Sequence, residues 1–392
     1  MSLPVAQPRL PPRIALTRYL DEIDRSRHYS NYGPLSVRFE ARLARHFEVI
    51  PDRVVAAANG TLALTAALMI AAPAPGALCL VPAWTFVATA HAVRLAGLVP
   101  YLVDVDPALG ALTPEIAAAA LATAPGPVAA VVPVLPFGQP LVETAADLAA
   151  WDDFADRHRL AVVIDAAAGF DAVRPRRAPV MVSLHATKVL GIGEGGVVIG
   201  PDLGFSEEMR RRLNFGFYQI RAAMVPALNA KLSEYHAAVG HAALDEWPQV
   251  RRAFQLVALN YRRALTDVEG VALPEGYGDR WVTSTTILRL DRPVADALAR
   301  ALAAVAIDTR PWWGSGVHRQ PAFADCPRTP LPVTDRLAAS TLGLPCFPDL
   351  AAGAVVRVAR AIARALESGA DGNLDMSSRR GLSQSPCPST IA

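Results

Sequence analysis

The chain has 392 residues, more than one hydrophobic core usually organises, so two packed units are expected. Hydrophobic residues make up 52% of it and charged residues 19%, which excludes an intrinsically disordered protein. The formal net charge is +2, and the positive residues are scattered along the chain without a basic stripe of interleaved aromatic residues. Nucleic acid is therefore not an expected partner.

The sequence shows neither a targeting signal nor a membrane segment. Residues 1–13 carry prolines where a signal peptide needs an apolar run, and the most apolar stretch, residues 60–72, is too short to span a bilayer. The four cysteines have neither CxxC nor Cys/His zinc spacing, which favours reduced thiols and no metal site; they are Cys79, Cys326, Cys346 and Cys387. We expect a cytoplasmic protein with no membrane partner.

The chain opens with the proline-rich arm over residues 1–13, and helical periodicity then predicts a helix over residues 35–47. Beyond it, short apolar runs alternate with alanine-rich helical runs, a pattern typical of a largely parallel sheet covered on both faces. The fold class is therefore α/β, with ligands expected outside the carboxyl ends of the strands. The expected strands are 77–82, 99–103, 128–135, 160–164, 180–184 and 196–199, and the expected helices are 62–70, 88–95, 113–122 and 145–157.

A second, smaller unit is expected after a long helix over residues 231–262. It contains a strand over 281–290, a helix over 294–305 and a terminal helix over 355–366. The last residues are rich in Ser, Gly, Asp and Pro and predict a disordered tail. The expected organisation is an arm (1–13), a large domain (14–245), a small domain (246–368) and the tail (369–392).

Lysine occurs only at Lys188 and Lys231, whereas 36 of the 38 basic residues are arginine. A lysine kept in such a chain points to a need for the primary amine, because a guanidinium cannot deprotonate to act as a nucleophile. Lys188 follows an apolar run in the segment SLHATKVLGIGEGG and precedes several glycines, which let the backbone approach a ligand. An ordinary loop lysine is the alternative interpretation.

Three further motifs accompany Lys188. Asp165 directly follows an apolar strand, where a carboxylate can hold a pyridinium proton, although a helix cap is an alternative role. Gly60 and Thr61 open an apolar helix whose free N–H groups suit a phosphate or an ordinary cap. Phe86 follows another strand, where its ring could stack on a planar cofactor or pack in the core.

In this order, the motifs resemble the sugar aminotransferase family of pyridoxal 5′-phosphate (PLP) enzymes, the DegT/DnrJ/EryC1/StrS group of the aspartate aminotransferase fold. The resemblance runs from about residue 29 to 366 and is most specific in HATK…EGG. It implies fold type I: a mostly parallel, seven-stranded type of sheet between helices, with a smaller C-terminal α+β domain. The other matching segments are SNYGPL, NGTLAL, PAWTFVAT, DAA, NFGF, NAKLSEYHAAVG, HRQPAF and LPCFP.

The resemblance also implies roles for individual residues. Lys188 matches the Schiff-base lysine and Asp165 the partner of the pyridine nitrogen. Asn229 matches an asparagine that reaches the cofactor phosphate of the neighbouring subunit, which implies a homodimer with shared active sites. The remaining matches are Phe86 to the stacking ring and Gly60, Thr61 and Ser183 to phosphate ligands.

The sequence departs from the family at Ala168, where Gln or His usually stands near the phenolic oxygen of the cofactor. A methyl group donates no hydrogen bond, so a water or a group such as His185 would have to substitute. Lys231 is expected to position the shared asparagine or to contact the partner subunit. Candidates for substrate contact are Asn31, Tyr32, His185, Trp312 and His318, with packing as the alternative for the tryptophans Trp312 and Trp313.

The implied reaction moves an amino group from a donor, by family habit glutamate, to the ketone of a nucleotide-linked deoxysugar. An aminocyclitol ketone or a carrier-tethered ketone remains an alternative, as does elimination or decarboxylation. The dehydratase branch of the family carries histidine in place of the lysine, so Lys188 argues against it. A non-catalytic sensor is disfavoured because no DNA-binding module flanks the domain.

Overall fold

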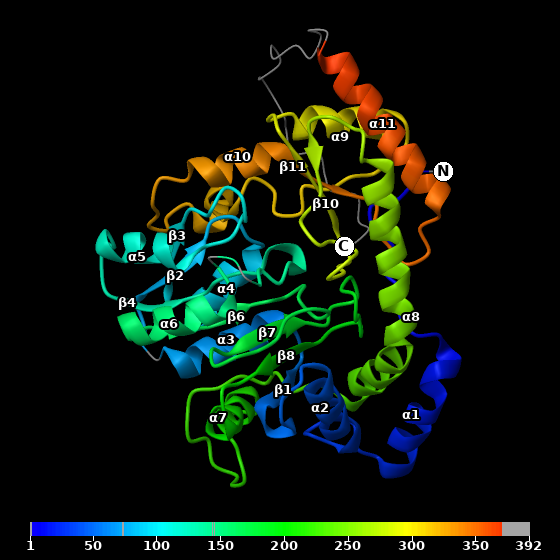
Figure 1. Cartoon of the computed structure of the whole chain (residues 1–392). Coiled ribbons are helices and arrows are strands. Elements are labelled where there is room, and N and C mark those ends of the chain that lie inside the picture. Colours follow the sequence, from blue (N-terminus) through cyan, green and yellow to red (C-terminus); the bar gives the residue numbers. More distant parts are fainter. Residues whose placement is uncertain (1, 73, 143, 145, 371–392) are drawn as a thin grey trace.

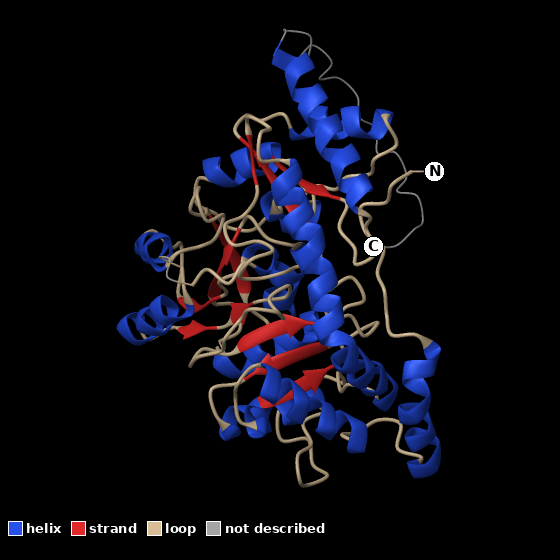
Figure 2. Ribbon diagram, turned by 45° about the vertical axis from the view of Figure 1, so that its right-hand side comes forward, coloured by secondary structure: helices blue, strands red, loops and turns tan. Residues whose placement is uncertain are grey.

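The computed structural model describes residues 2–72, 74–142, 144 and 146–370. Its larger part is a twisted sheet between two layers of helices, and its smaller part holds a second sheet beside α9 and α11 (Figures 1 and 2). Of the tail expected over residues 369–392, residues 369 and 370 belong to α11. The remainder, 371–392, lies outside the described residues. None of the helices described is both long and apolar enough to cross a bilayer.

The large sheet has the strand order β3-β2-β4-β5/β6-β7-β8-β1. β5 and β6 are two halves of one strand interrupted at Val163, and a parallel bridge between Val134 and Asp165 joins the two halves of the sheet. Only β8 runs antiparallel to the others, which confirms the expected seven-stranded, mostly parallel sheet. The bounds are β1 Val54–Ala57, β2 Leu78–Pro82, β3 Val99–Val103, β4 Val128–Val131, β5 Ala161–Val162, β6 Ile164–Asp165, β7 Val180–Ser183 and β8 Gly196–Ile199.

Alternate residues along each strand enter two different cores, as the period of two in a strand requires. Val54 and Ala56 belong to the core under α2, α5, α6 and α8, whereas Val55 and Ala57 belong to the core under α3, α4 and α7. Both faces are therefore buried, which explains the continuous apolar runs in the sequence. The helices are α2 Pro34–His46, α3 Gly60–Ala71, α4 Val87–Leu95, α5 Pro114–Ala122, α6 Leu148–His158 and α7 Leu203–Leu213.

Helix α8 (Glu234–Ala264) connects the two parts of the molecule. The expected boundary at 245/246 falls inside this continuous helix, so both parts share it (Figure 1). The smaller part has an antiparallel sheet of order β11-β10-β9. Its elements are β9 Val271–Ala272, β10 Thr286–Leu290, α9 Ala295–Ala304, α10 Pro332–Ser340, β11 Thr341–Leu344 and α11 Ala352–Ala370.

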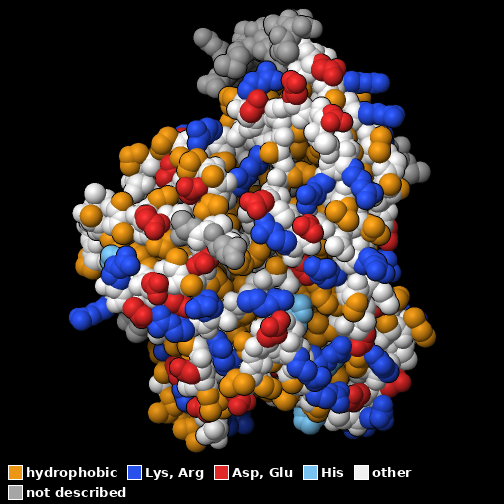
Figure 3. Space-filling model, viewed as in Figure 1, with side chains coloured by type: hydrophobic (Ala, Val, Ile, Leu, Met, Phe, Trp, Pro, Cys, Tyr) orange, Lys and Arg blue, Asp and Glu red, His pale blue; other side chains and the backbone are white. Residues whose placement is uncertain are grey.

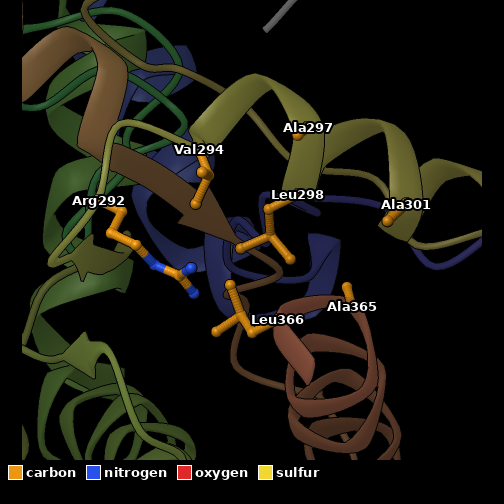
Figure 4. A pocket seen from close by; sticks show the side chains of 7 residues that line it. All are labelled: Arg292, Val294, Ala297, Leu298, Ala301, Ala365 and Leu366. Carbon is orange, nitrogen blue, oxygen red and sulfur yellow. The ribbon is translucent and has the colours of Figure 1, made fainter. Parts of the chain in front are cut away.

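The N-terminal arm is an ordered part of the smaller unit. Leu3 forms a parallel bridge with Ile307, and the N–H of Cys346 donates to the carbonyl of Val5 at 2.9 Å. Helix α1 (Arg13–Ser26) follows the arm and packs against α8. Close to the end of the chain, α9 and α11 leave a narrow cavity of about 30 Å³ between them, lined by Arg292, Val294, Ala297, Leu298, Ala301, Ala365 and Leu366 (Figure 4).

Two predicted strands extend well beyond the strands observed. The strand expected over 281–290 begins only at Thr286, because the N–H of Val282 donates to the buried Asp171 carboxylate at 2.9 Å instead of to a neighbouring strand. The strand expected over 128–135 ends at Val131, since Pro133 has no N–H for a ladder. The strands predicted over residues 99–103 and 196–199 are confirmed, with the same first and last residues.

Glu234 fixes the start of α2. Its carboxylate is buried and accepts the N–H groups of Leu35 and Ser36, each at 2.8 Å. A Cβ atom at Gly33 would lie 2.6 Å from Cδ of Glu234, so the close approach requires glycine. This contact joins the SNYGPL and NAKLSEYH segments, which are distant in sequence.

We expect Glu234→Ala to lower the free energy of unfolding by about 1–3 kcal/mol, because two helix N–H groups lose their buried acceptor. Chemical denaturation followed by circular dichroism measures the change. Glu269→Ala, at an exposed position, is the matched control and should stay within about 0.5 kcal/mol of the parent. Equal stabilities of the two variants would show that the cap contributes nothing.

Candidate active site

The expected site residues lie where parallel strands end. Asp165 closes β6, Ser183 closes β7, and Phe86 follows β2. Gly60 opens α3, directly beyond β1. These strands run in one direction, so their carboxyl ends share one edge of the sheet, where α/β folds bind ligands.

Asp165 is the buried charge of this site, with 4% of its surface exposed. The hydroxyl of Thr89 donates to its Oδ2 at 2.8 Å, and the N–H of Ala167 donates to its Oδ1 at 3.0 Å. Burial raises the pKa of the Asp165 carboxyl, although the two hydrogen bonds and nearby Lys188 oppose the shift. A cationic ring nitrogen would stabilise this carboxylate further.

Lys188 lies in the turn after β7, half-buried, with its N–H bonded to the carbonyl of His185 at 2.8 Å. Desolvation lowers the pKa of its ammonium group below the usual lysine value, and the Asp165 carboxylate opposes this. The charges of Lys188 and Asp165 each oppose the shift that burial causes in the pKa of the other group. A lysine with a lowered pKa is a nucleophile toward an aldehyde.

Gly60 and Ser183 form a cradle beside this pair. A Cβ atom at Gly60 would lie 3.2 Å from Cβ of Ser183, a tight contact, so glycine eases the close approach of the helix start. The side chain of Asn59 caps the N–H of Leu62 at 2.9 Å. In the described part of the chain, the N–H groups of Gly60 and Thr61 have no acceptor, which suits a phosphate at the helix N-terminus.

Phe86 projects beside the Asp165 network. Its ring is 56% exposed, and its carbonyl accepts the N–H of Thr89 at 3.2 Å, so the residue that holds Asp165 also fixes the position of Phe86. An exposed aromatic ring at this place is available to stack on a planar ligand. Thr89 itself is a site residue that the sequence did not indicate; its only signal is the spacing of four residues after Thr85, whose hydroxyl lies 3.0 Å away.

Ala168 lies against the turn that follows β4. Gly138 has φ +89°, and a Cβ atom there would lie 2.3 Å from the carbonyl oxygen of Ala168 and 3.4 Å from its methyl group. The turn therefore packs directly on the position where the family usually has Gln or His. His185 has other partners: its Nδ1 lies 2.8 Å from Oγ1 of Thr187, and its Nε2 lies 3.6 Å from Glu194.

Asn229 is exposed, and its Oδ1 accepts a hydrogen bond from Nζ of Lys231 at 2.8 Å. The segment pairs with the end of β1 through an antiparallel bridge between Ala57 and Lys231. Both side chains thus lie at the surface near the helix start at Gly60, and their role toward a partner subunit stays a prediction.

Of the five candidates for substrate contact, only His185 lies in the same turn as Lys188. The other four lie on other segments of the chain. Asn31 is exposed, and Tyr32 donates its hydroxyl to the carbonyl of Arg210 at 3.1 Å. His318 is buried, with its Nε2 2.9 Å from Asp335. Trp312 places its Nε1 against Gly343, where a Cβ atom would lie 2.3 Å away. Substrate contact by these four stays a prediction.

The N-terminal arm lines part of the space beside Lys188, which the sequence did not indicate. Gln7 and Arg9 line a cavity of about 20 Å³ together with Thr187, Lys188 and Ser284. The guanidinium of Arg9 is held at 3.1 Å from Asp349 of the smaller unit. Residues from both ends of the chain therefore close the space next to Lys188.

The residues present fit PLP: a lysine for its aldehyde, a carboxylate for its ring nitrogen, a helix start for its phosphate and a free aromatic face. Together with the fold, they define an enzyme of the PLP-dependent aminotransferase class. The chain belongs to the DegT/DnrJ/EryC1/StrS aminotransferase family, whose model matches residues 14–363. It is therefore a PLP-dependent transaminase, as the sequence predicted.

Three relatives illustrate the similarity. The erythromycin biosynthesis sensory transduction protein EryC1 of Saccharopolyspora erythraea is 33% identical over 81% of this chain and 87% of its own. The dTDP-3-amino-3,4,6-trideoxy-alpha-D-glucose transaminase of Streptomyces venezuelae is 32% identical over 84% of this chain and 86% of its own. The structure of DesI in the presence of its TDP-sugar product has a TM-score of 0.82 and 30% identity, covering 94% of each chain.

We expect covalent uptake of PLP by the apoprotein to accelerate with pH and to reach half its maximal rate below 10.5, the ordinary lysine value. The neutral amine is the nucleophile, and a lowered pKa makes it available at lower pH. Borohydride trapping followed by mass spectrometry measures the fixed cofactor. Lys188→Ala should fix none and Lys231→Ala should fix the same amount as the parent; a midpoint at or above 10.5 contradicts the expectation.

Proposed function

We propose that this transaminase transfers an amino group from L-glutamate to the keto group of a nucleotide-linked deoxysugar. The observation that carries the proposal is the Lys188–Asp165 pair beside the helix start at Gly60, in a chain of this family. Two relatives support the substrate class: one is named as a transaminase of a dTDP-linked aminodeoxysugar, and DesI was solved with a TDP-sugar.

Bound PLP supplies an electron sink for the carbon that carries the amino group. In this proposal Asp165 holds the positive charge of the ring nitrogen, and Gly60, Thr61 and Ser183 hold the phosphate. With PLP bound, Nζ of Lys188 would act as the general base toward the proton on the substrate carbon and then as the general acid that gives this proton back. Desolvation favours its neutral form for the first of these steps.

A homodimer with shared sites is part of the proposal. Asn214 and Asn229 form an antiparallel bridge, and the loop between them exposes apolar side chains: the ring of Phe215 lies under Nζ of Lys231 at 4.5 Å, and Ile220 and Met224 are exposed. Tyr29 and Tyr235 stack 6.2 Å apart and are about half exposed. Exposed apolar patches of this kind mark subunit contacts.

Other reactions of the same site differ in what they require. An aminocyclitol ketone or a carrier-tethered ketone would need the same Lys188 chemistry, whereas elimination would need no amino acceptor. The name of the S. erythraea relative includes a sensory role, which keeps a non-catalytic function as a specific alternative. A cytoplasmic location stays a prediction, in keeping with the free thiols of Cys79, Cys326 and Cys346.

We expect the holoprotein to aminate a nucleotide keto-deoxysugar when glutamate is present, with the amine product detected by mass spectrometry. Glutamate alone should convert the visible cofactor band to that of the amine form. Lys188→Ala should abolish turnover, whereas Lys231→Ala should keep the glutamate-driven band conversion. A cofactor band that stays unchanged in glutamate would contradict the proposal and support elimination chemistry or a sensory role.

We expect co-expressed Lys188→Ala and Asn229→Ala chains to recover activity that neither variant has alone. In a mixed dimer, the site that uses Lys188 of one chain would receive Asn229 from the other, and one complete site would result. Differently tagged chains allow the mixed dimer to be purified and assayed. If each chain held its own asparagine, both sites would stay defective and no activity would return.

A further inference from the structure

A groove of about 430 Å³ lies between α1 and α2, with the start of α8 as its floor. The cavities beside Lys188 and between α9 and α11 measure only about 20 and 30 Å³. The volume of the groove is within the range of about 300–1,000 Å³ that is usual for small-molecule sites. Its lining residues are Arg18, Tyr19, Glu22, Arg38, Ala41, Arg42, Arg45 and His241.

The polar face of α2 is unusual in carrying one kind of charge. Arg38, Arg42 and Arg45 recur at spacings of four and three residues, so they form one stripe on the helix. The neighbouring stripe of the same helix, with Leu35 and Phe39, is buried in the core. Figure 3 shows Lys and Arg side chains gathered over α1 and α2, at the lower right of that view.

Ion pairs hold part of this stripe in position. Nη2 of Arg38 lies 2.6 Å from both carboxylate oxygens of Glu22, and Nη2 of Arg42 lies 2.8 Å from Asp245. Arg18 also pairs with Asp245. These ion pairs orient the guanidinium groups of Arg18, Arg38 and Arg42 across the groove, which lowers the entropy cost of binding a ligand.

The charges in the groove do not cancel. Four arginines face the two carboxylates of Glu22 and Asp245, so two positive charges remain. Arg45 is exposed and has no acidic partner among the described residues.

His241 adds no charge to the groove. Burial lowers its pKa to about 4, the hydrogen bond to Leu35 opposes this shift, and Arg42 and Arg38 lower the pKa further. The ring is neutral near pH 7, its Nε2 lies 3.0 Å from the carbonyl of Leu35, and its Nδ1 lies 3.1 Å from Nη1 of Arg42. The excess charge therefore belongs to guanidinium groups alone.

We propose that this groove binds a diphosphate group, free or as part of a nucleotide, at a site separate from the Lys188 pocket. Planar guanidinium groups bind phosphoryl oxygens through paired, charge-assisted hydrogen bonds. Two adjacent phosphoryl groups match the two unbalanced positive charges and the row of arginines along α2 better than a single phosphate does. The proposal does not depend on which ketone the enzyme uses.

Titration calorimetry with pyrophosphate tests the site. The holoprotein is first reduced with borohydride, so that the cofactor phosphate fills the helix start at Gly60. The Arg38→Gln/Arg45→Gln variant should bind pyrophosphate at least tenfold more weakly than the parent. Arg263→Gln/Arg300→Gln is the matched control, since it removes the same charge from exposed positions on α8 and α9 and should bind like the parent.

Two further titrations separate the possible ligands. Inorganic phosphate should bind more weakly than pyrophosphate. A nucleoside diphosphate should lose its binding to the groove in the groove variant, whether or not it also binds in the catalytic pocket. Unchanged pyrophosphate affinity in the groove variant overturns the proposal. A groove variant that dissociates in sedimentation velocity, with its pyrophosphate affinity intact, overturns it as well and assigns the groove to a subunit contact.

Discussion

The site depends on the buried carboxylate of Asp165, whose charge the surrounding groups must stabilise. A carboxylate removed from water is costly unless hydrogen bonds and a cation stabilise it. The chain supplies two donors, the Thr89 hydroxyl and the Ala167 N–H, and brings Lys188 near enough to affect its pKa. These groups only partly offset burial, since the pKa of Asp165 remains raised. A pyridinium nitrogen would complete the charge balance, so affinity for the cofactor is built into the electrostatics of the protein itself.

The topology of the sheet explains how these groups meet. Asp165 and Ser183 end neighbouring parallel strands, and the chain returns through β8, the one antiparallel strand, after the turn that holds Lys188. β8 then lies beside β1, where a Cβ atom at Gly196 would approach the backbone of Asn59 to 2.6 Å. The start of α3 is thereby held against the end of β7 and the start of β8, between which the turn of Lys188 lies. One reversal of strand direction thus joins the nucleophile to the phosphate cradle.

Features encoded locally could be predicted from the sequence, and features that depend on distant contacts could not. Lys188 and Asp165 follow apolar runs directly, so their places at strand ends were evident. Thr89 was missed as a partner of Asp165, because the two are 76 residues apart and meet only when α4 packs on the sheet. The strand expected to begin at 281 was shortened by the Asp171 carboxylate, 111 residues away from Val282. The long helix expected over residues 231–262 is local in the sequence, and it is observed as α8, Glu234–Ala264.

The last feature of the site is the packing around Ala168, where a small residue takes the place of the polar one that the family usually has. Gly138, in a left-handed conformation, rests on the carbonyl and methyl group of Ala168, and the preceding Phe137 stacks on Trp313 of the smaller unit at 3.9 Å. Trp313 also meets Trp84, two residues before Phe86. A small residue at 168 is therefore linked through one turn to an aromatic contact between the two parts of the chain. The turn that packs on Ala168 is therefore held in part by the smaller unit, so its position depends on how that unit packs against the sheet.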